Sequence, residues 1–300
     1  MPFHRSSPSS SPHPIRVTSA GPSPAVVPAL SRPAVTATLR AAGCVFAEDE
    51  AELLVAAART PAELAAMVDR RVLGHPLEHI VGWAEFHGLR VAVDEGVFVP
   101  RRRTEFLVGR AVALGRRAAR PAPDRTRVVD LCCGSGAVGT ALAAALDRVE
   151  LHAADIEPAA VRCARRNVAA AGGEVYEGDL FAPLPDGLRG RIDILVANVP
   201  YVPTEEVGLL PAEARDHEPM VALDGGADGL DVLRRVTASA PRWLAPGGHL
   251  LVETSERQAE RAVDAFARGG LVPRVAVSDE WYATVVIGTR PIGDGGARRP

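Results

Sequence analysis

The feature that most constrains the fold of this chain is a short apolar strand that leads through a loop of small residues into a helix. Val128 and Val129 form the strand, Asp130 closes it, residues 132–136 are small, and residues 137–146 are rich in alanine and leucine. Glycines let backbone and ligand approach closely, and the first turn of a helix offers N–H groups that have no partner within the helix. The order of strand, loop and helix therefore predicts a nucleotide-cofactor site.

The charge beside the loop indicates which cofactor it holds. Gly134, Gly136 and Gly139 fit the dinucleotide pattern G-x-G-x-x-G, but small residues are also common where a helix merely packs on a strand. Asp130 is more informative, because a carboxylate before the loop attracts a cation and repels a pyrophosphate. The sequence therefore favours S-adenosylmethionine, which carries a sulfonium and an ammonium group, over NAD. The residues expected to contact it here are Asp130, Cys132, Cys133, Gly134, Ser135 and Gly136.

Strand-like and helix-like stretches alternate from this loop onward. The expected strands are 150–155, 175–177, 192–197 and 249–254, the expected helices are 158–171, 228–244 and 255–268, and residues 272–277 and 282–289 form a closing strand pair. Alternation of this kind predicts an α/β fold, in which helices cover both faces of a mostly parallel sheet.

The chain divides into five parts by composition. They are a Ser- and Pro-rich tail at 1–35, a small helical domain at 36–79, a hairpin linker at 80–103, the α/β domain at 104–290 and a loose tail at 291–300. The first tail is too polar to bury a core, so we expect it to be disordered, either as an overlong start or as a weak transit peptide. In the helical domain, residues 48–59 form one helix. Thr60–Glu63 is a capping box that starts a second, which stops near Gly74.

Composition limits the class of protein. The net charge of −3 provides no general attraction to nucleic acid, and no apolar run reaches the ~18 residues that span a membrane. The four cysteines include no C-x-x-C pair, so we expect no metal site and treat the thiols as reduced and buried. We therefore expect a cytoplasmic protein.

Two further carboxylates follow the next strands. Asp155 ends the second strand ~20 residues after the glycine loop, where a carboxylate can accept hydrogen bonds from both hydroxyls of an adenosine ribose. This holds for NAD as well as for S-adenosylmethionine. Asp179 and Leu180 follow the third strand, where the adenine edge is expected, although Asp179 can equally cap the next turn.

The turn Asn198–Tyr201 distinguishes S-adenosylmethionine from NAD as the expected cofactor. It directly follows the fourth strand, at the edge of the sheet where open α/β folds bind ligands. The side-chain oxygen of Asn198 and the carbonyl of Val199 can accept both hydrogens of an –NH₂ group, and this turns the nitrogen lone pair toward an incoming methyl. Val199 precedes Pro200 and is held extended, and Tyr201 can pack on the flat face of the substrate. We expect these four residues to be catalytic, and Asn198 also to contact the cofactor.

With these residues in view, the chain resembles the HemK/PrmC-type protein-(glutamine-N5) methyltransferases, which methylate a glutamine of peptide chain release factors. The likeness runs from about Gly74 to Gln258 and includes residues 76–77, 82–88, 99–105, 130–136, 198–201 and 218–230. The resemblance implies a class I S-adenosylmethionine-dependent methyltransferase fold, which is Rossmann-like with a seven-stranded sheet, and a small N-terminal helical domain. It also implies a glutamine-bearing protein as substrate, with a release factor as the first candidate.

This sequence departs from the family pattern at several positions. Val199 stands where the family usually has proline, Cys132 where it has glycine, and Arg102-Arg103 where it has Pro-Glu. The helical region before Gly74 is also shorter than the family's substrate-binding domain. Three alternatives stay open on the sequence: an adenine-N6 nucleic-acid methyltransferase, an NAD-dependent oxidoreductase, and a non-catalytic cofactor-binding module.

Overall fold

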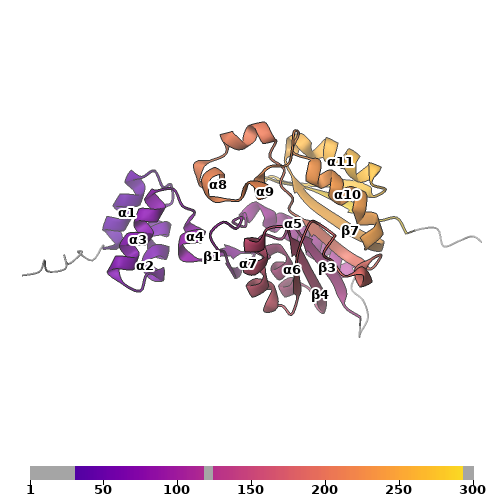
Figure 1. Cartoon of the computed structure of the whole chain (residues 1–300), viewed down its shortest axis with the longest axis horizontal. Coiled ribbons are helices and arrows are strands. Elements are labelled where there is room, and N and C mark those ends of the chain that lie inside the picture. Colours follow the sequence, from indigo (N-terminus) through magenta and orange to yellow (C-terminus); the bar gives the residue numbers. More distant parts are fainter. Residues whose placement is uncertain (1–30, 118–123, 293–300) are drawn as a thin grey trace, which may run out of the picture.

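The computed structural model describes residues 31–117 and 124–292. These residues form a three-helix bundle at one end of the molecule, a connecting helix and hairpin, and a larger α/β domain (Figure 1). Most of the two expected tails (1–30 and 293–300) and residues 120–123 of a proline-rich loop lie outside the described residues. No helix of the described part is long and apolar enough to cross a membrane.

The bundle consists of α1 (Arg32–Ala41), α2 (Ala47–Ala57) and α3 (Pro61–Val72). The predicted end of the tail at residue 35 is therefore too late in the sequence, because α1 begins at Arg32 and buries Val35 and Leu39 completely. These two apolar side chains, four residues apart, face α2 and α3 and outweigh the polar composition around them.

The capping box at the start of α3 is confirmed. The hydroxyl of Thr60 accepts a hydrogen bond from the Glu63 N–H at 3.1 Å, and the Glu63 carboxylate accepts one from the N–H of Arg59 at 2.8 Å. Both bonds satisfy donors that a helix start would otherwise leave open. The helix ends at Val72, close to the predicted stop at Gly74.

A short helix and a hairpin join the bundle to the α/β domain. Helix α4 (Leu77–Val81) precedes strands β1 (Trp83–Phe86) and β2 (Leu89–Ala92), which pair antiparallel. The hairpin is thus confirmed, but its predicted start at residue 80 lies inside α4, which Gly82 ends with a φ of 82°.

The α/β domain contains the predicted alternation. Its first elements are the 3₁₀ turn η1 (Arg102–Thr104), α5 (Glu105–Arg117), β3 (Thr126–Leu131), α6 (Ala137–Ala145), β4 (Val149–Asp155), α7 (Pro158–Ala169) and β5 (Glu174–Glu177). A turn η2 (Asp186–Leu188) precedes β6 (Ile192–Ala197). The last elements are α10 (Asp231–Trp243), β7 (Leu244–Thr254), η4 (Glu256–Gln258), α11 (Ala259–Arg268), β8 (Val272–Ser278) and β9 (Ala283–Thr289).

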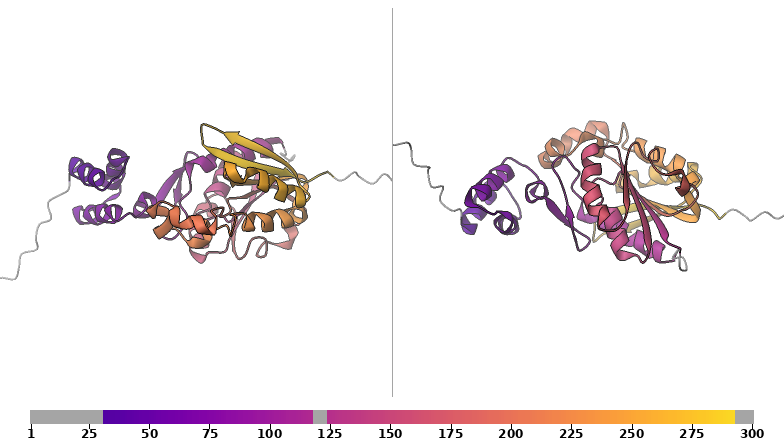
Figure 2. Two further views of the ribbon diagram at one scale, coloured as in Figure 1. Left: turned by 90° about the horizontal axis from the view of Figure 1, so that it is seen from above. Right: turned by 60° about the horizontal axis from the view of Figure 1, so that its bottom comes forward.

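The sheet has seven strands in the order β5-β4-β3-β6-β7-β9-β8, and only β9 runs against its neighbours. Helices α5, α6 and α7 bury apolar side chains on one face, and α10 and α11 do so on the other (Figures 1 and 2). This is the α/β class I methyltransferase architecture expected from the sequence. Strand β4 pairs with one edge of β3, and β6 pairs with the other edge. Because the order of strands reverses at this point, a ligand crevice is expected at the carboxyl ends of β3 and β6.

One segment was not foreseen from periodicity. Residues 204–223, here called the cover segment, form η3 (Thr204–Leu209), α8 (Ala212–His217) and α9 (Met220–Leu223). Each of the three begins directly after a proline, at Pro203, Pro211 and Pro219. Proline fixes φ and lacks an N–H, which suits the first turn of a helix and is unfavourable in its interior.

The bundle contacts the cover segment. The Arg71 guanidinium of α3 donates to Glu213 of α8 at 3.1 Å and to Glu50 of α2 at 2.6 Å. The rings of His75 and His217 stack with centroids 4.2 Å apart. These contacts place the N-terminal domain beside one wall of the site described next.

Candidate active site

A cavity of about 600 Å³ opens at the carboxyl ends of β3, β4 and β6. It is lined by all but one of the residues that the sequence singled out: Asp130, Cys132, Cys133, Gly134, Ser135, Asp155, Asp179, Leu180, Asn198, Val199, Pro200 and Tyr201. The cover segment closes its far side with Leu210, Pro211 and Val221, among others. Residues at the ends of four strands (β3, β4, β5 and β6) thus meet the cover segment at one place.

Gly136 is the exception. It is the N-cap of α6 at a φ of 75°, and a Cβ on it would lie 2.9 Å from a Val168 methyl and 3.2 Å from the Ala164 Cβ. It is absent from the residues that line the cavity in the described structure. In the structure this glycine lets α6 pack closely on α7, and its contact with the cofactor stays a prediction.

The loop backbone is fixed by Asp155. One carboxylate oxygen accepts the N–H of Gly134 at 2.8 Å, and the other accepts the N–H of Glu157 at 2.9 Å. Each oxygen keeps a second lone pair, so the group can still accept hydroxyl hydrogens from a ligand. Burial raises the pKa of this carboxyl, and the two N–H donors counteract the rise.

Asp130 is buried beneath the loop, with 2% of its surface exposed. Its Oδ2 accepts the Gly139 N–H from the first turn of α6 at 2.8 Å. Burial raises its pKa from the ordinary 3.8 to about 7, since the N–H bond only partly compensates for lost hydration. A cation placed beside it would restore the charged form, which is the behaviour expected of a residue that faces a sulfonium or ammonium group.

This raised pKa predicts a pH-dependent affinity for S-adenosylmethionine. Below pH 7 the carboxyl is protonated in the free protein, so the affinity should rise by about tenfold between pH 6 and pH 8. Calorimetric titration at several pH values measures this. Asp130→Asn keeps an acceptor for Gly139 but loses the charge, and should bind weakly at every pH. Equal affinity of the wild-type protein at pH 6 and pH 8 would contradict the assignment.

Asp179 and Leu180 follow β5 and also line the cavity. The Asp179 carboxylate forms an ion pair with Arg235 of α10 at 2.5 Å. This ion pair, and not the capping of the next turn, is the partner that the structure gives to the carboxylate. Leu180 adopts a φ of 50°, which is unusual for a residue with a side chain, and it packs partly against the core beneath α10. Both residues are placed to form an edge for a flat ring.

Asn198 carries the most informative atom of the site. Its Oδ1 is buried, yet among the described residues it has no hydrogen-bond partner. A buried polar atom without a partner costs about 1–3 kcal/mol, so such atoms persist where a ligand completes them. Since Asn198 lines the cavity, the missing partner is expected to be a hydrogen-bond donor on a bound molecule.

Tyr201 is held in place by residues that the sequence did not assign to the site. Arg103 of η1 donates to the Tyr201 hydroxyl and, through Nε, to the Glu253 carboxylate at 2.9 Å. Thr104 also lines the cavity, and its buried hydroxyl has no partner in the described structure. The only signal for Arg103 was its place in a motif where the resembled family has glutamate.

Arg101 and Glu218 join the hairpin linker to the cover segment. Both Glu218 carboxylate oxygens accept from the Arg101 guanidinium, at 2.6 and 2.7 Å, and one also accepts the Val99 N–H at 3.1 Å. The Glu218 side chain is almost fully buried. This bridge fixes one end of the cover segment, next to the cavity.

The residues present fit the cofactor proposed from the sequence. A buried acid, a loop of small residues and an acceptor at the end of β4 suit a cationic nucleoside, and the 600 Å³ cavity is large enough for it. Asn198, Arg101 and Arg103 also line the cavity, and binding of the nucleoside does not need them. They are therefore available to a second molecule, the substrate. No group of three or more His, Cys, Asp or Glu side chains in the described ranges is arranged to hold a metal ion.

Comparison with known proteins agrees with this geometry. The family model described as "Methyltransferase small domain" matches residues 110–212. The release factor glutamine methyltransferase of Geobacter sulfurreducens is 39% identical over 77% of this chain and 79% of its own length. The enzyme of the same name from Mycolicibacterium smegmatis is 40% identical over 79% of this chain and 88% of its own.

A third relative has a different substrate in its name. The 4-amino-L-phenylalanine/4-methylamino-L-phenylalanine methyltransferase of Streptomyces pristinaespiralis is 37% identical over 64% of this chain and 65% of its own length. The longer matches decide the family. By its sequence, its seven-stranded sheet and its cavity, this chain belongs to the release factor glutamine methyltransferases, a family of S-adenosylmethionine-dependent enzymes.

Proposed function

We propose that this protein methylates the side-chain amide nitrogen of a glutamine in a protein substrate, and that the substrate is a peptide chain release factor. The observation that carries the proposal is the buried, unpartnered Oδ1 of Asn198 in the cavity. A primary amide presents two N–H donors on a planar nitrogen, which is the partner that this oxygen lacks. The names of the Geobacter and Mycolicibacterium relatives support a release factor as the source of the glutamine.

The task of the chain is alignment. Bound S-adenosylmethionine would supply a methyl group that its positive sulfur already activates. Asn198 Oδ1 and the Val199 carbonyl accept the two amide hydrogens, which weakens the conjugation of the nitrogen and directs its lone pair. The Tyr201 ring, held by Arg103, provides a flat surface for the planar group. Positioned acceptors of this kind lower the barrier because they need no reorganisation during the reaction.

The surroundings of the site are consistent with this assignment. The net charge of −3 does not favour a nucleic acid as the substrate. The four cysteines are free thiols, as expected in a reducing compartment, and we include a cytoplasmic location in the proposal.

A second candidate is methylation of the amino group of a small aromatic amine. It is favoured by the relative named for 4-amino-L-phenylalanine. An aromatic –NH₂ group also presents two hydrogens to Asn198 and Val199. The same site chemistry therefore serves both substrates, and the choice between them depends on how the cavity is covered.

Methylation of defined substrates distinguishes the two. The purified protein is incubated with S-adenosylmethionine labelled in the methyl group and, in separate reactions, with a purified bacterial release factor or with 4-amino-L-phenylalanine. We expect label on one glutamine of the release factor, located by tandem mass spectrometry of its peptides. Label only on the amine would replace the first candidate with the second. No label on either, from a protein that binds the cofactor, would contradict both.

A further inference from the structure

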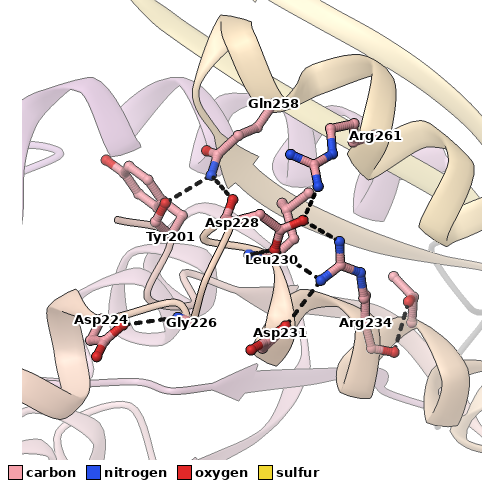
Figure 3. A network of polar contacts seen from close by, with 10 residues as sticks. Tyr201, Asp224, Gly226, Asp228, Leu230, Asp231, Arg234, Gln258 and Arg261 are labelled. Carbon is pink, nitrogen blue, oxygen red and sulfur yellow. Dashed lines mark hydrogen bonds and ion pairs between the residues drawn. The ribbon is translucent and has the colours of Figure 1, made fainter. Parts of the chain in front are cut away.

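The turn Asn198–Tyr201 is held from behind by a side chain outside the cavity wall. The amide nitrogen of Gln258 donates to the Tyr201 carbonyl at 2.9 Å and to the Asp228 carbonyl at 3.0 Å (Figure 3). Gln258 lies in η4, directly after β7, and only 8% of its surface is exposed. It thus joins the turn after β6 to the segment that leads into α10.

The orientation of this amide is fixed by its other end. The Gln258 Oε1 accepts a hydrogen bond from the Ser255 hydroxyl at 2.7 Å. The oxygen is therefore turned toward Ser255, and both hydrogens of the nitrogen point at the two carbonyls. With its acceptor and both donors engaged, the side chain is a rigid connection between two loops.

The second loop is pressed against the turn. Residues 224–230, here called the brace, run beside it, and the Gly225 N–H donates to the Val202 carbonyl at 2.8 Å. A Cβ on Gly229 would lie 2.2 Å from the Tyr201 carbonyl oxygen, and one on Gly225 would lie 2.7 Å from the Pro200 carbonyl oxygen. Only glycine allows this approach at both positions.

The brace is itself anchored. The Asp228 carboxylate accepts from Arg234 of α10, at 2.9 Å for one of its two contacts, and from Arg261 of α11 (Figure 3). The Leu230 N–H adds a bond to the same carboxylate at 3.2 Å. These partners hold the pKa of Asp228 at about 2, below its usual range, so the anchor stays charged at any working pH.

The sequence of the turn explains why a brace matters here. Val199 stands where the resembled family usually has a proline, so the turn has one fixed φ fewer. The Val199 carbonyl is one of the two acceptors assigned to the substrate nitrogen. Displacement of such an acceptor by about 1 Å is enough to cost a large factor in rate.

We propose that Gln258 is a positioning residue, which acts through the Tyr201 carbonyl to keep the Asn198–Tyr201 turn in its productive shape. It supplies by hydrogen bonding the rigidity that a proline at position 199 would supply covalently. The inference rests on the proposed function, because its effect is measured as methyl transfer. Gln258 has no assigned contact with substrate or cofactor.

The test combines a change at Gln258 with a change at Val199. Gln258→Met keeps the length of the side chain but removes both donors, and should lower kcat about tenfold while the KM for the protein substrate and the affinity for S-adenosylhomocysteine stay within about twofold. Val199→Pro keeps the backbone carbonyl of residue 199 and is measured alone as the reference for the double variant. In the double variant, Val199→Pro should restore kcat to within about threefold of the Val199→Pro single variant.

Two controls separate positioning from folding. Arg257→Ala changes the neighbouring residue of η4, whose side chain is 82% exposed and pairs with Glu206 at the surface, and should leave kcat and melting temperature unchanged. If Gln258→Met fails to fold, Ser255→Ala is measured in its place. It frees the amide to rotate and should lower kcat about threefold, again with rescue by Val199→Pro.

The outcomes distinguish this inference from the proposed function. If the wild-type protein transfers no methyl to either substrate, the proposed function fails. If the wild-type protein is active and the Gln258→Met protein folds with normal kcat, Gln258 does not position the turn. A loss of kcat that Val199→Pro does not repair would show that Gln258 acts on something other than the rigidity of the turn, which also overturns the inference.

Discussion

Asn198→Ala is expected to slow methyl transfer by roughly 10²–10³, which corresponds to ~3–4 kcal/mol of barrier, while the cofactor binds almost normally. The reason is the position of the side chain. Its Oδ1 is a buried acceptor without a partner in the described structure, so we expect it to form its hydrogen bond with the substrate and not with the cofactor. Single-turnover methylation of the identified substrate, with calorimetric binding of S-adenosylhomocysteine in parallel, measures the two effects separately.

The matched control is Asn198→Asp, which keeps an oxygen at the same place and replaces only the amide nitrogen. It should retain more activity than the alanine variant, because the acceptor for the substrate hydrogen remains. Near-normal turnover of Asn198→Ala would mean that the turn serves only the structure, and the nitrogen-methylation assignment would then be wrong.

The second large effect is expected at Asp155. Asp155→Ala should weaken binding of S-adenosylhomocysteine by roughly 1.5–3 kcal/mol, or about 10- to 150-fold. The carboxylate is expected to accept ribose hydroxyls and also holds the Gly134 N–H at 2.8 Å, so its removal affects both the ligand and the loop that surrounds it. Calorimetric titration gives the affinity, and titration with NADH should show no binding by either protein.

Asp179→Ala is the control for charge. Its carboxylate lines the same cavity but is paired with Arg235 at 2.5 Å and is half exposed, so its removal should weaken binding by less than about tenfold. Equal losses at Asp155 and Asp179 would point to a general electrostatic effect. Tight binding of NADH would overturn the choice of cofactor.

The sequence was sufficient for the sheet and for most of the cofactor half of the site. Strands β3 and β6 contain short apolar runs, residues 128–129 and 194–197, each followed directly by a polar residue, and this local pattern places Asp130 and Asn198 at one edge of the sheet. Gly136 shows the limit of such a motif. Its spacing matched a ligand loop, but its Cβ position faces α7, which no local pattern reveals.

The remaining features depend on residues far apart in the chain. The Gln258 bond to Tyr201 and the Glu218 bridge to Arg101 join segments whose order in the sequence carries no period. The helices of the cover segment were not predicted because they are too short to show amphipathic spacing, although a proline precedes each of them. The tail was placed as far as residue 35 for the opposite reason, because the composition there is polar although Val35 and Leu39 are completely buried in α1.

The cavity wall is built partly from the strands of the sheet and partly from the cover segment. Only the first part is also needed to hold the fold together. β3, β4 and β6 carry the acids and the turn, and their register holds the whole sheet together. The cover segment contributes no strand to the sheet, and Leu209 and Met220 on it are 83% and 55% exposed. Substitutions at such exposed positions leave the sheet intact, so we expect the methyl acceptor to be changed more easily by altering the exposed residues between Pro203 and Asp224 than by altering the turn after β6, with the buried Glu218 as the fixed point of the segment.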